Sequence, residues 1–135
     1  MSQTVLVLGG GVGGVVAANR LRRRLPAEHR VVVVDREESF QLAASFLWVM
    51  NGSRRPDQVR RPLARLERRG IEVVRGEIER LDPGRRAVVV SGRELQGDHV
   101  IVALGAEFAP EAVPGWPTRA SPSAPWTARP ACGLP

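Results

Sequence analysis

The amino-acid sequence predicts an α/β fold that combines a parallel sheet with a small antiparallel meander. The first observation is a succession of strand, helix and strand, at residues 4–8, 12–25 and 31–34. The second is that residues 31–34 are all valine, which is typical of a strand covered on both faces. A βαβ unit of this kind joins parallel strands through a right-handed crossover.

The other elements follow from similar patterns. In the first helix, apolar side chains recur at helical spacing and a proline ends the last turn: Val15, Ala18, Leu21, Leu25 and Pro26. Downstream we expect a short helix at 62–69, closed by Gly70, and strands at 71–74, 78–81, 87–90, around Leu95 and at 100–103. Residues 37–55 are irregular and unusually apolar. We expect them to lie over another surface or to fold into short helices.

A glycine-rich stretch directly follows the first strand. Residues 9–14 contain the G-x-G-x-x-G pattern, with Gly9, Gly11 and Gly14 at its defining positions. The first glycine permits a tight turn, the second lets the backbone approach a pyrophosphate, and the third lets the helix pack closely on the sheet. The N-terminus of the helix offers N–H groups to phosphates. The motif predicts a Rossmann-type dinucleotide site that also includes Val12 and Gly13.

An acidic residue ends the second strand. Asp35 follows Gly14 by about 20 positions, the spacing expected of the residue that accepts hydrogen bonds from a ribose diol. A carboxylate there disfavours a 2′-phosphate, so NADP is not expected. Arg36 is included in the same predicted site. The alternative reading is a glycine-rich turn with an incidental Asp, and the pattern alone does not separate FAD from NAD.

Further segments resemble a known family. Residues 100–106 resemble the strand and turn that pass near the cofactor in flavoproteins with two dinucleotide domains, although Leu104 replaces the usual Thr. The segments that look like sulfide:quinone oxidoreductases and, more loosely, type II NADH dehydrogenases are residues 39–41, 46–49, 52, 61–63, 70–76 and 107–115. The resemblance covers residue 4 to about residue 115.

This resemblance implies a Rossmann-like FAD/NAD(P)-binding fold of the pyridine nucleotide-disulfide oxidoreductase type. FAD is the expected cofactor, with Ala103 and Gly105 as further backbone contacts. In an intact relative, electrons would pass through the flavin to a quinone or another acceptor. The sequence assigns no catalytic residue and predicts no metal site.

The chain is expected to be a truncated member of that family. Residues 1–115 would be an incomplete N-terminal FAD-binding domain, and residues 116–135 a disordered or out-of-frame tail. A one-base frameshift is one hypothesis, because residues 116–120 can be read as Leu-Ala-Asp-Ala-Gly in another frame. The family's second dinucleotide-binding insert and late Gly-Asp motif are not found, so we expect an inactive fragment. Cys132 is expected to be incidental, and His29 and His99 to be structural or solvated.

Two other classes of function stay open. A stand-alone NAD-binding Rossmann module would explain the glycine pattern and Asp35, but not the apolar loop or the meander. The net charge of +6 and the arginines between residues 53 and 69 could attract an anionic partner. We expect a solvated surface instead and no nucleic acid, because aromatic platforms and binding motifs are missing. A cytoplasmic location is expected, with membrane contact only through a C-terminal part.

Overall fold

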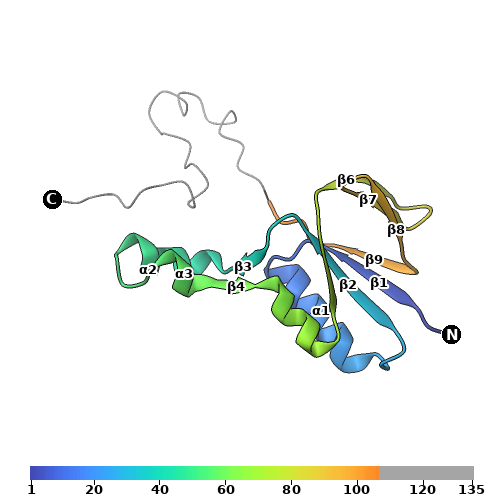
Figure 1. Ribbon diagram of the computed structural model, residues 1–135, viewed down its shortest axis with the longest axis horizontal. Helices are drawn as coiled ribbons and strands as arrows, with labels where there is room; N and C mark the ends of the chain where they lie inside the picture. The colour runs from blue at the N-terminus through green and yellow to red at the C-terminus, as the bar shows by residue number, and fades with distance from the viewer. Residues whose placement is uncertain (107–135) are drawn as a thin grey trace. The chain divides into compact units, whose positions relative to one another are not determined.

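A computed structural model describes residues 1–106 of the chain, and their centre is a four-stranded parallel sheet (Figure 1). The strand order is β5-β2-β1-β9. The strands are β1 (Thr4–Leu8), β2 (Arg30–Asp35), β5 (Glu72–Arg75) and β9 (His99–Val102). Helices cover one face of this sheet and a small antiparallel sheet covers the other. The predicted Rossmann-like α/β class is confirmed.

The central strands bury both of their faces. In β1, Val5 and Val7 pack toward the helices, whereas Leu6 and Leu8 pack toward the antiparallel sheet. The β2 valines divide in the same way, and all four are at most 3% exposed. Side chains alternate along a strand, so a strand between two layers needs apolar residues at every position. The prediction drawn from the four valines is confirmed.

Helix α1 (Val12–Arg24) joins the two central strands. Its predicted apolar positions face the sheet: Ala18 is buried, and Val15, Leu21 and Leu25 pack around it. The helix ends before Pro26, and the Arg22 guanidinium donates hydrogen bonds to the carbonyls of Leu25, Pro26 and His29. These bonds connect the last turn of the helix to its C-cap, Leu25, and to the loop that leads into β2.

The meander is also confirmed. It consists of β6 (Ile78–Asp82), β7 (Ala87–Val90) and β8 (Arg93–Gln96), paired antiparallel in that order. Val88 and Val90 of β7 pack against the central sheet. The meander lies between β5 and β9 in the chain, so it forms the connection that crosses the face opposite α1 (Figure 1).

Residues 39–62, which we call the arm, form a separate projection (Figure 1). The strands β3 (Ser39–Gln41) and β4 (Arg60–Pro62) pair antiparallel at its base. Between them lie η1 (Ala43–Ser45), α2 (Phe46–Met50) and α3 (Pro56–Val59). The expected short helices are present, whereas the hairpin was not predicted.

The predicted helix at 62–69 needs a correction. Pro62 lies in β4 with extended backbone, opposite Ser39, so the helix begins one residue later. The element, η2 (Leu63–Arg69), is a 3₁₀ helix that buries Leu63 and Leu66. Gly70 ends it as expected: its φ of +74° is left-handed, and its N–H donates to the Glu67 carbonyl.

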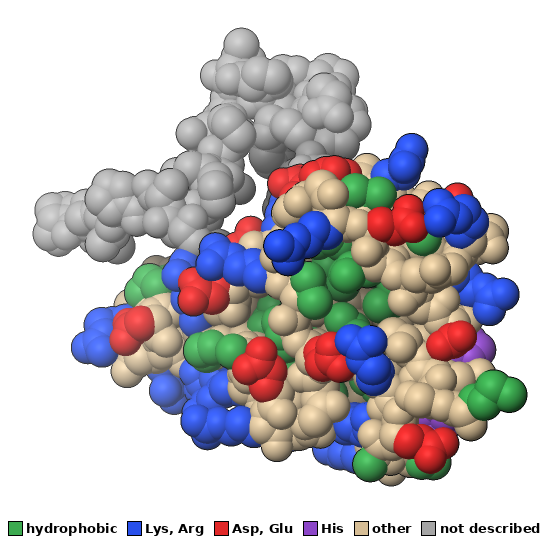
Figure 2. All heavy atoms as spheres, turned by 45° about the vertical axis from the view of Figure 1, so that its right-hand side comes forward, with side chains coloured by type: hydrophobic (Ala, Val, Ile, Leu, Met, Phe, Trp, Pro, Cys, Tyr) green, Lys and Arg blue, Asp and Glu red, His purple; other side chains and the backbone are tan. Residues whose placement is uncertain are grey.

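The surface carries both signs of charge. Figure 2 shows basic and acidic side chains interspersed over one face, with apolar side chains exposed between them. Within the described part of the chain, no helix has both the length and the apolar character that crossing a membrane requires. The predicted tail at 116–135 and Cys132 lie outside the described residues.

Candidate functional site

The glycine loop lies at the carboxyl end of β1 and leads into α1. Gly9 extends the parallel ladder by one hydrogen bond, from its N–H to the Val34 carbonyl at 2.8 Å. Its φ is +105°, and a Cβ at this position would lie 2.3 Å from the Ala103 carbonyl oxygen. Only glycine fits both the left-handed turn and this close approach to the end of β9.

The other two defining glycines have opposite surroundings. A Cβ on Gly14 would lie 1.8 Å from the Gly9 carbonyl oxygen, so the absence of a side chain allows α1 to pack against the loop. A Cβ on Gly11 would meet nothing within 4 Å. Gly14 therefore serves internal packing, and Gly11 leaves an open surface that an outside group can approach.

The N-terminus of α1 faces this open surface. Gly11 is the N-cap and provides no side-chain cap, and the first turn contains no acidic residue. The first hydrogen bond of the helix runs from the Val15 N–H to the Gly11 carbonyl at 2.9 Å. Among the described residues, none accepts from the backbone N–H groups of residues 11–14. Unpaired N–H groups and the helix dipole make this end suited to an anion.

Asp35 lies beside the loop, at the end of β2. Its Oδ2 accepts a hydrogen bond from the Gly10 N–H, and its Oδ1 accepts from the Glu37 N–H at 2.7 Å. Each carboxylate oxygen has a second lone pair, so both can still accept from a ribose hydroxyl.

Gly10 was missed by the sequence reasoning. A Cβ there would lie 2.7 Å from Leu63 Cδ1 and 3.1 Å from Asp35 Oδ2. The absence of a side chain at Gly10 therefore allows the Asp35 carboxylate and η2 to pack closely against the loop. The signal was available in the sequence, because Gly9, Gly10 and Gly11 are consecutive and the motif accounts for only two of them.

The remaining predicted residues differ in their distance from the loop. Ala103 donates its N–H to the Leu8 carbonyl at 2.8 Å, and its Cβ would lie 3.7 Å from a Cβ on Gly13. Gly105 has a φ of +81° and lies in open space past the end of β9.

Arg36 is exposed and turned toward two acids. Its guanidinium lies 3.8 Å from the Glu77 carboxylate and 3.9 Å from that of Glu37. Long, exposed ion pairs of this kind are weak, so the Arg36 side chain is free to exchange these partners for another anion.

The geometry fits a dinucleotide. An open glycine, a row of unpaired N–H groups and an adjacent carboxylate match the pyrophosphate and the ribose of a dinucleotide.

Residues 1–106 contain no cluster of three or more His, Cys, Asp or Glu side chains arranged to hold a metal ion. His29 has a structural contact, since its Nδ1 accepts from the Gln3 N–H at 3.0 Å. Fold and site together define a Rossmann-type dinucleotide-binding domain.

Comparison with known proteins specifies the family. The model of the pyridine nucleotide-disulphide oxidoreductase family matches residues 3–123, and the chain belongs to this family. This family and the sulfide:quinone oxidoreductases within it are FAD-binding flavoproteins, which agrees with the cofactor expected from the sequence. The prediction of a flavin-dependent oxidoreductase similar to sulfide:quinone oxidoreductase is therefore confirmed at the level of the family.

The chain is similar to two sulfide:quinone enzymes and to the solved structure of one of them. The sulfide-quinone reductase of Aquifex aeolicus is 30% identical over 107 residues, which are 78% of this chain and 25% of that protein. The mitochondrial sulfide:quinone oxidoreductase of Mus musculus is 31% identical over 117 residues, 84% of this chain and 25% of its own length. The X-ray structure of the Aquifex aeolicus enzyme superposes with a TM-score of 0.75 at 28% identity, covering 79% of this chain and 25% of that one. The chain thus spans about a quarter of the length of these relatives.

Proposed function

We propose that this chain binds FAD through the glycine loop and Asp35, as the N-terminal part of a flavin-dependent oxidoreductase that delivers electrons to a quinone. The observation that carries the proposal is the contrast between Gly11 and Gly14. One glycine opens the loop to the outside while the other packs the helix that points its N–H groups there. Residues 1–115 would form this cofactor-binding part.

Each group would have a distinct task. The N–H groups of residues 11–14 would donate to the pyrophosphate, and the Asp35 carboxylate would accept from the adenosine ribose. The Ala103 backbone would support the loop from β9, and Gly105 and Arg36 would lie at the margin of the site. Bound FAD would supply two-electron redox chemistry, whereas these residues bind and orient it.

Quinone as the electron acceptor is supported by the two relatives, which are a sulfide-quinone reductase and a sulfide:quinone oxidoreductase.

We propose that the 135-residue polypeptide alone does not catalyse quinone reduction, because three quarters of each relative lies outside the segment that matches this chain. The measurement is reduction of decylubiquinone by sulfide or NADH with FAD present. We expect no rate above the protein-free control, and a clear enzymatic rate would refute this part of the proposal.

Titration of the purified chain with FAD and with NAD tests the cofactor itself. Quenching of flavin fluorescence reports the first, and isothermal calorimetry reports both. We expect FAD to bind at least about tenfold more tightly than NAD, and Asp35→Ala to weaken FAD binding about tenfold, through loss of a charged hydrogen-bond acceptor. Asp57→Asn in the arm is the matched control and should leave the affinity unchanged. Tighter binding of NAD would instead favour a stand-alone NAD-binding module.

A further inference from the structure

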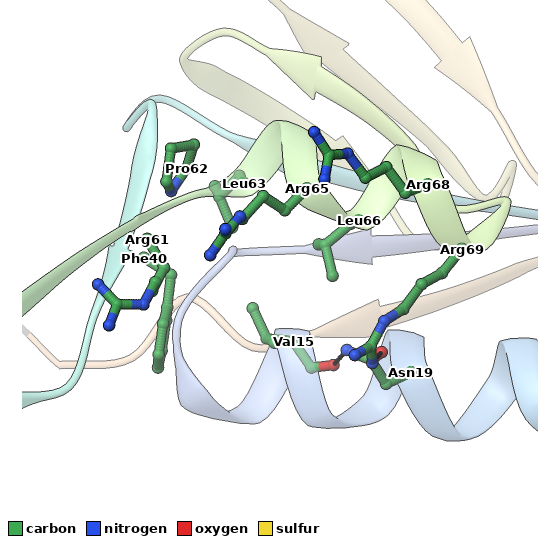
Figure 3. A pocket seen from close by; sticks show the side chains of 10 residues that line it. All are labelled: Val15, Asn19, Phe40, Arg61, Pro62, Leu63, Arg65, Leu66, Arg68 and Arg69. Carbon is green, nitrogen blue, oxygen red and sulfur yellow. Dashed lines mark hydrogen bonds between the residues drawn. The ribbon is translucent and has the colours of Figure 1, made fainter.

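A cavity beside the cofactor loop is not explained by cofactor binding. Its volume is about 390 Å³, and it opens between α1, η2 and the base of the arm (Figure 3). The apolar part of its lining consists of Val15, Phe40, Pro62, Leu63 and Leu66. Figure 3 shows Val15 and Leu66 facing each other across it. None of the glycines of the loop contributes to the lining.

The polar part of the lining is almost entirely cationic. It consists of Asn19, Arg61, Arg65, Arg68 and Arg69. Arg69 donates to the Asn19 side-chain oxygen at 2.5 Å, as Figure 3 shows. Arg61 donates to the backbone carbonyls of Gln58 and Arg60, at 3.0 and 2.8 Å.

These arginines differ from others in the molecule in their lack of counter-charge. Arg30, Arg55 and Arg85 each pair with an acidic side chain at 3.1 Å or less. In the described part of the chain, no carboxylate lies within ion-pair distance of the four arginines of the cavity. Clustered cations over an apolar floor create a positive potential at a place where apolar surface is also exposed.

We propose that this cavity binds a soluble amphipathic anion, a phosphate or carboxylate group attached to an apolar body. The volume lies within the range of small-molecule sites, which are mostly apolar with a few placed polar groups. Guanidinium groups bind phosphate and carboxylate through paired, charge-assisted hydrogen bonds. The apolar floor would favour a ligand with a hydrocarbon portion over a bare ion. The inference does not depend on FAD binding, because it uses different side chains.

Octyl phosphate, added to the full chain below its micelle concentration, is the probe. The expected result is saturable binding at one site, with shifts of the methyl NMR signals of Val15, Leu63 and Leu66 in selectively labelled protein. Val12 and Val16, which are half exposed on α1, should not shift. Inorganic phosphate and octyl glucoside should bind at least about fivefold more weakly than octyl phosphate. Inorganic phosphate lacks the hydrocarbon chain, and octyl glucoside lacks the anionic group.

Variants separate the cavity from general surface charge. Arg65→Gln should weaken octyl phosphate binding about fivefold, whereas Arg93→Gln, an exposed arginine on β8 in the other layer, should have no effect. Equal effects of both variants, or equal affinity for octyl phosphate and octyl glucoside, would overturn the proposal.

Displacement of octyl phosphate by FAD would assign the cavity to the cofactor instead, and would also overturn the proposal. Phosphatidylglycerol vesicles should leave the methyl signals of Val15, Leu63 and Leu66 unchanged. A shift of these signals would show that the anion belongs to a lipid, and would overturn the proposal of a soluble ligand.

Discussion

The βαβ unit at residues 4–35 and the arm at residues 39–62 are neighbours in sequence but differ in how they are held. The interiors of β1 and β2 are buried on both faces, with side chains between 0 and 5% exposed. In the arm only Ser45 is buried, and Leu47, Trp48 and Met50 are 66, 52 and 80% exposed. The candidate cofactor site thus lies on the densely packed unit, whereas the arm exposes apolar and basic side chains.

This difference has a physical reason. A pyrophosphate site depends on backbone N–H groups held in one geometry, and packed strands and a helix fix a backbone better than a loop does. The arm is paired only at its base, by the short β3–β4 ladder. Its exposed α2 and the Arg54 guanidinium, 5.9 Å from the centre of the Trp48 ring, contribute surface rather than core.

The largest expected effect comes from adding one methyl group to the packed unit. Gly14→Ala places a Cβ 1.8 Å from the Gly9 carbonyl oxygen, and backbone must move to relieve the clash. We expect a loss of about 3 kcal/mol or more in the free energy of unfolding, measured by urea denaturation. In the arm, Gly52→Ala meets no atom within 4 Å but has a φ of +75°, so about 1 kcal/mol is expected. Similar losses for both variants would contradict the comparison.

Truncation of apolar side chains sharpens the comparison. Val33 is completely buried in β2, and Val33→Ala should cost about 2 kcal/mol because two buried methyl groups are lost and a small cavity is left. Leu47→Ala in the arm should change stability by no more than about 0.5 kcal/mol, since the side chain is mostly in water. Thermal and urea unfolding of both variants measure the difference. A large effect at Leu47 would mean that the arm is packed in solution.

The sequence predicted the packed unit better than the arm. The glycine pattern, the four valines and Asp35 each have a local signature, and the structure places these residues together. The β3–β4 hairpin pairs short segments with no alternation of apolar residues, so its pairing depends on contacts distant in sequence. The sequence predicts a helix that begins at Pro62 because proline favours first turns, but pairing with Ser39 keeps its backbone extended. Gly10 was missed because its role depends on Leu63, which only the folded chain brings near it.

The smallest expected effect concerns an ion pair at the edge of the central sheet. Arg30 donates two hydrogen bonds of 2.8 Å to the Glu72 carboxylate. Through these bonds and its charge, Arg30 lowers the pKa of Glu72. A lowered pKa means that the pair stabilises the fold above the ordinary pKa of the carboxyl group, and that this contribution is lost as pH falls through the lowered value. Both side chains are about half exposed, so Glu72→Gln should cost only about 0.5 kcal/mol at pH 7.

The pH dependence of that variant provides the check. Urea midpoints of the wild type and Glu72→Gln should converge as the solution is acidified through the carboxyl titration. A difference that stays constant down to low pH would show that packing, and not the charge of Glu72, is responsible.

The measurement that tests the central claim most directly is an FAD titration of Gly11→Ala beside the wild type. Gly11 has extended backbone, with φ −74° and ψ −168°, and open space around its Cβ position, so alanine fits the fold. We predict a change in unfolding free energy of about 0.5 kcal/mol or less, together with at least a tenfold loss of FAD affinity, because the methyl group occupies the surface that the pyrophosphate approaches. Undiminished FAD binding by a stably folded Gly11→Ala variant would contradict the assignment of the glycine loop as the cofactor site.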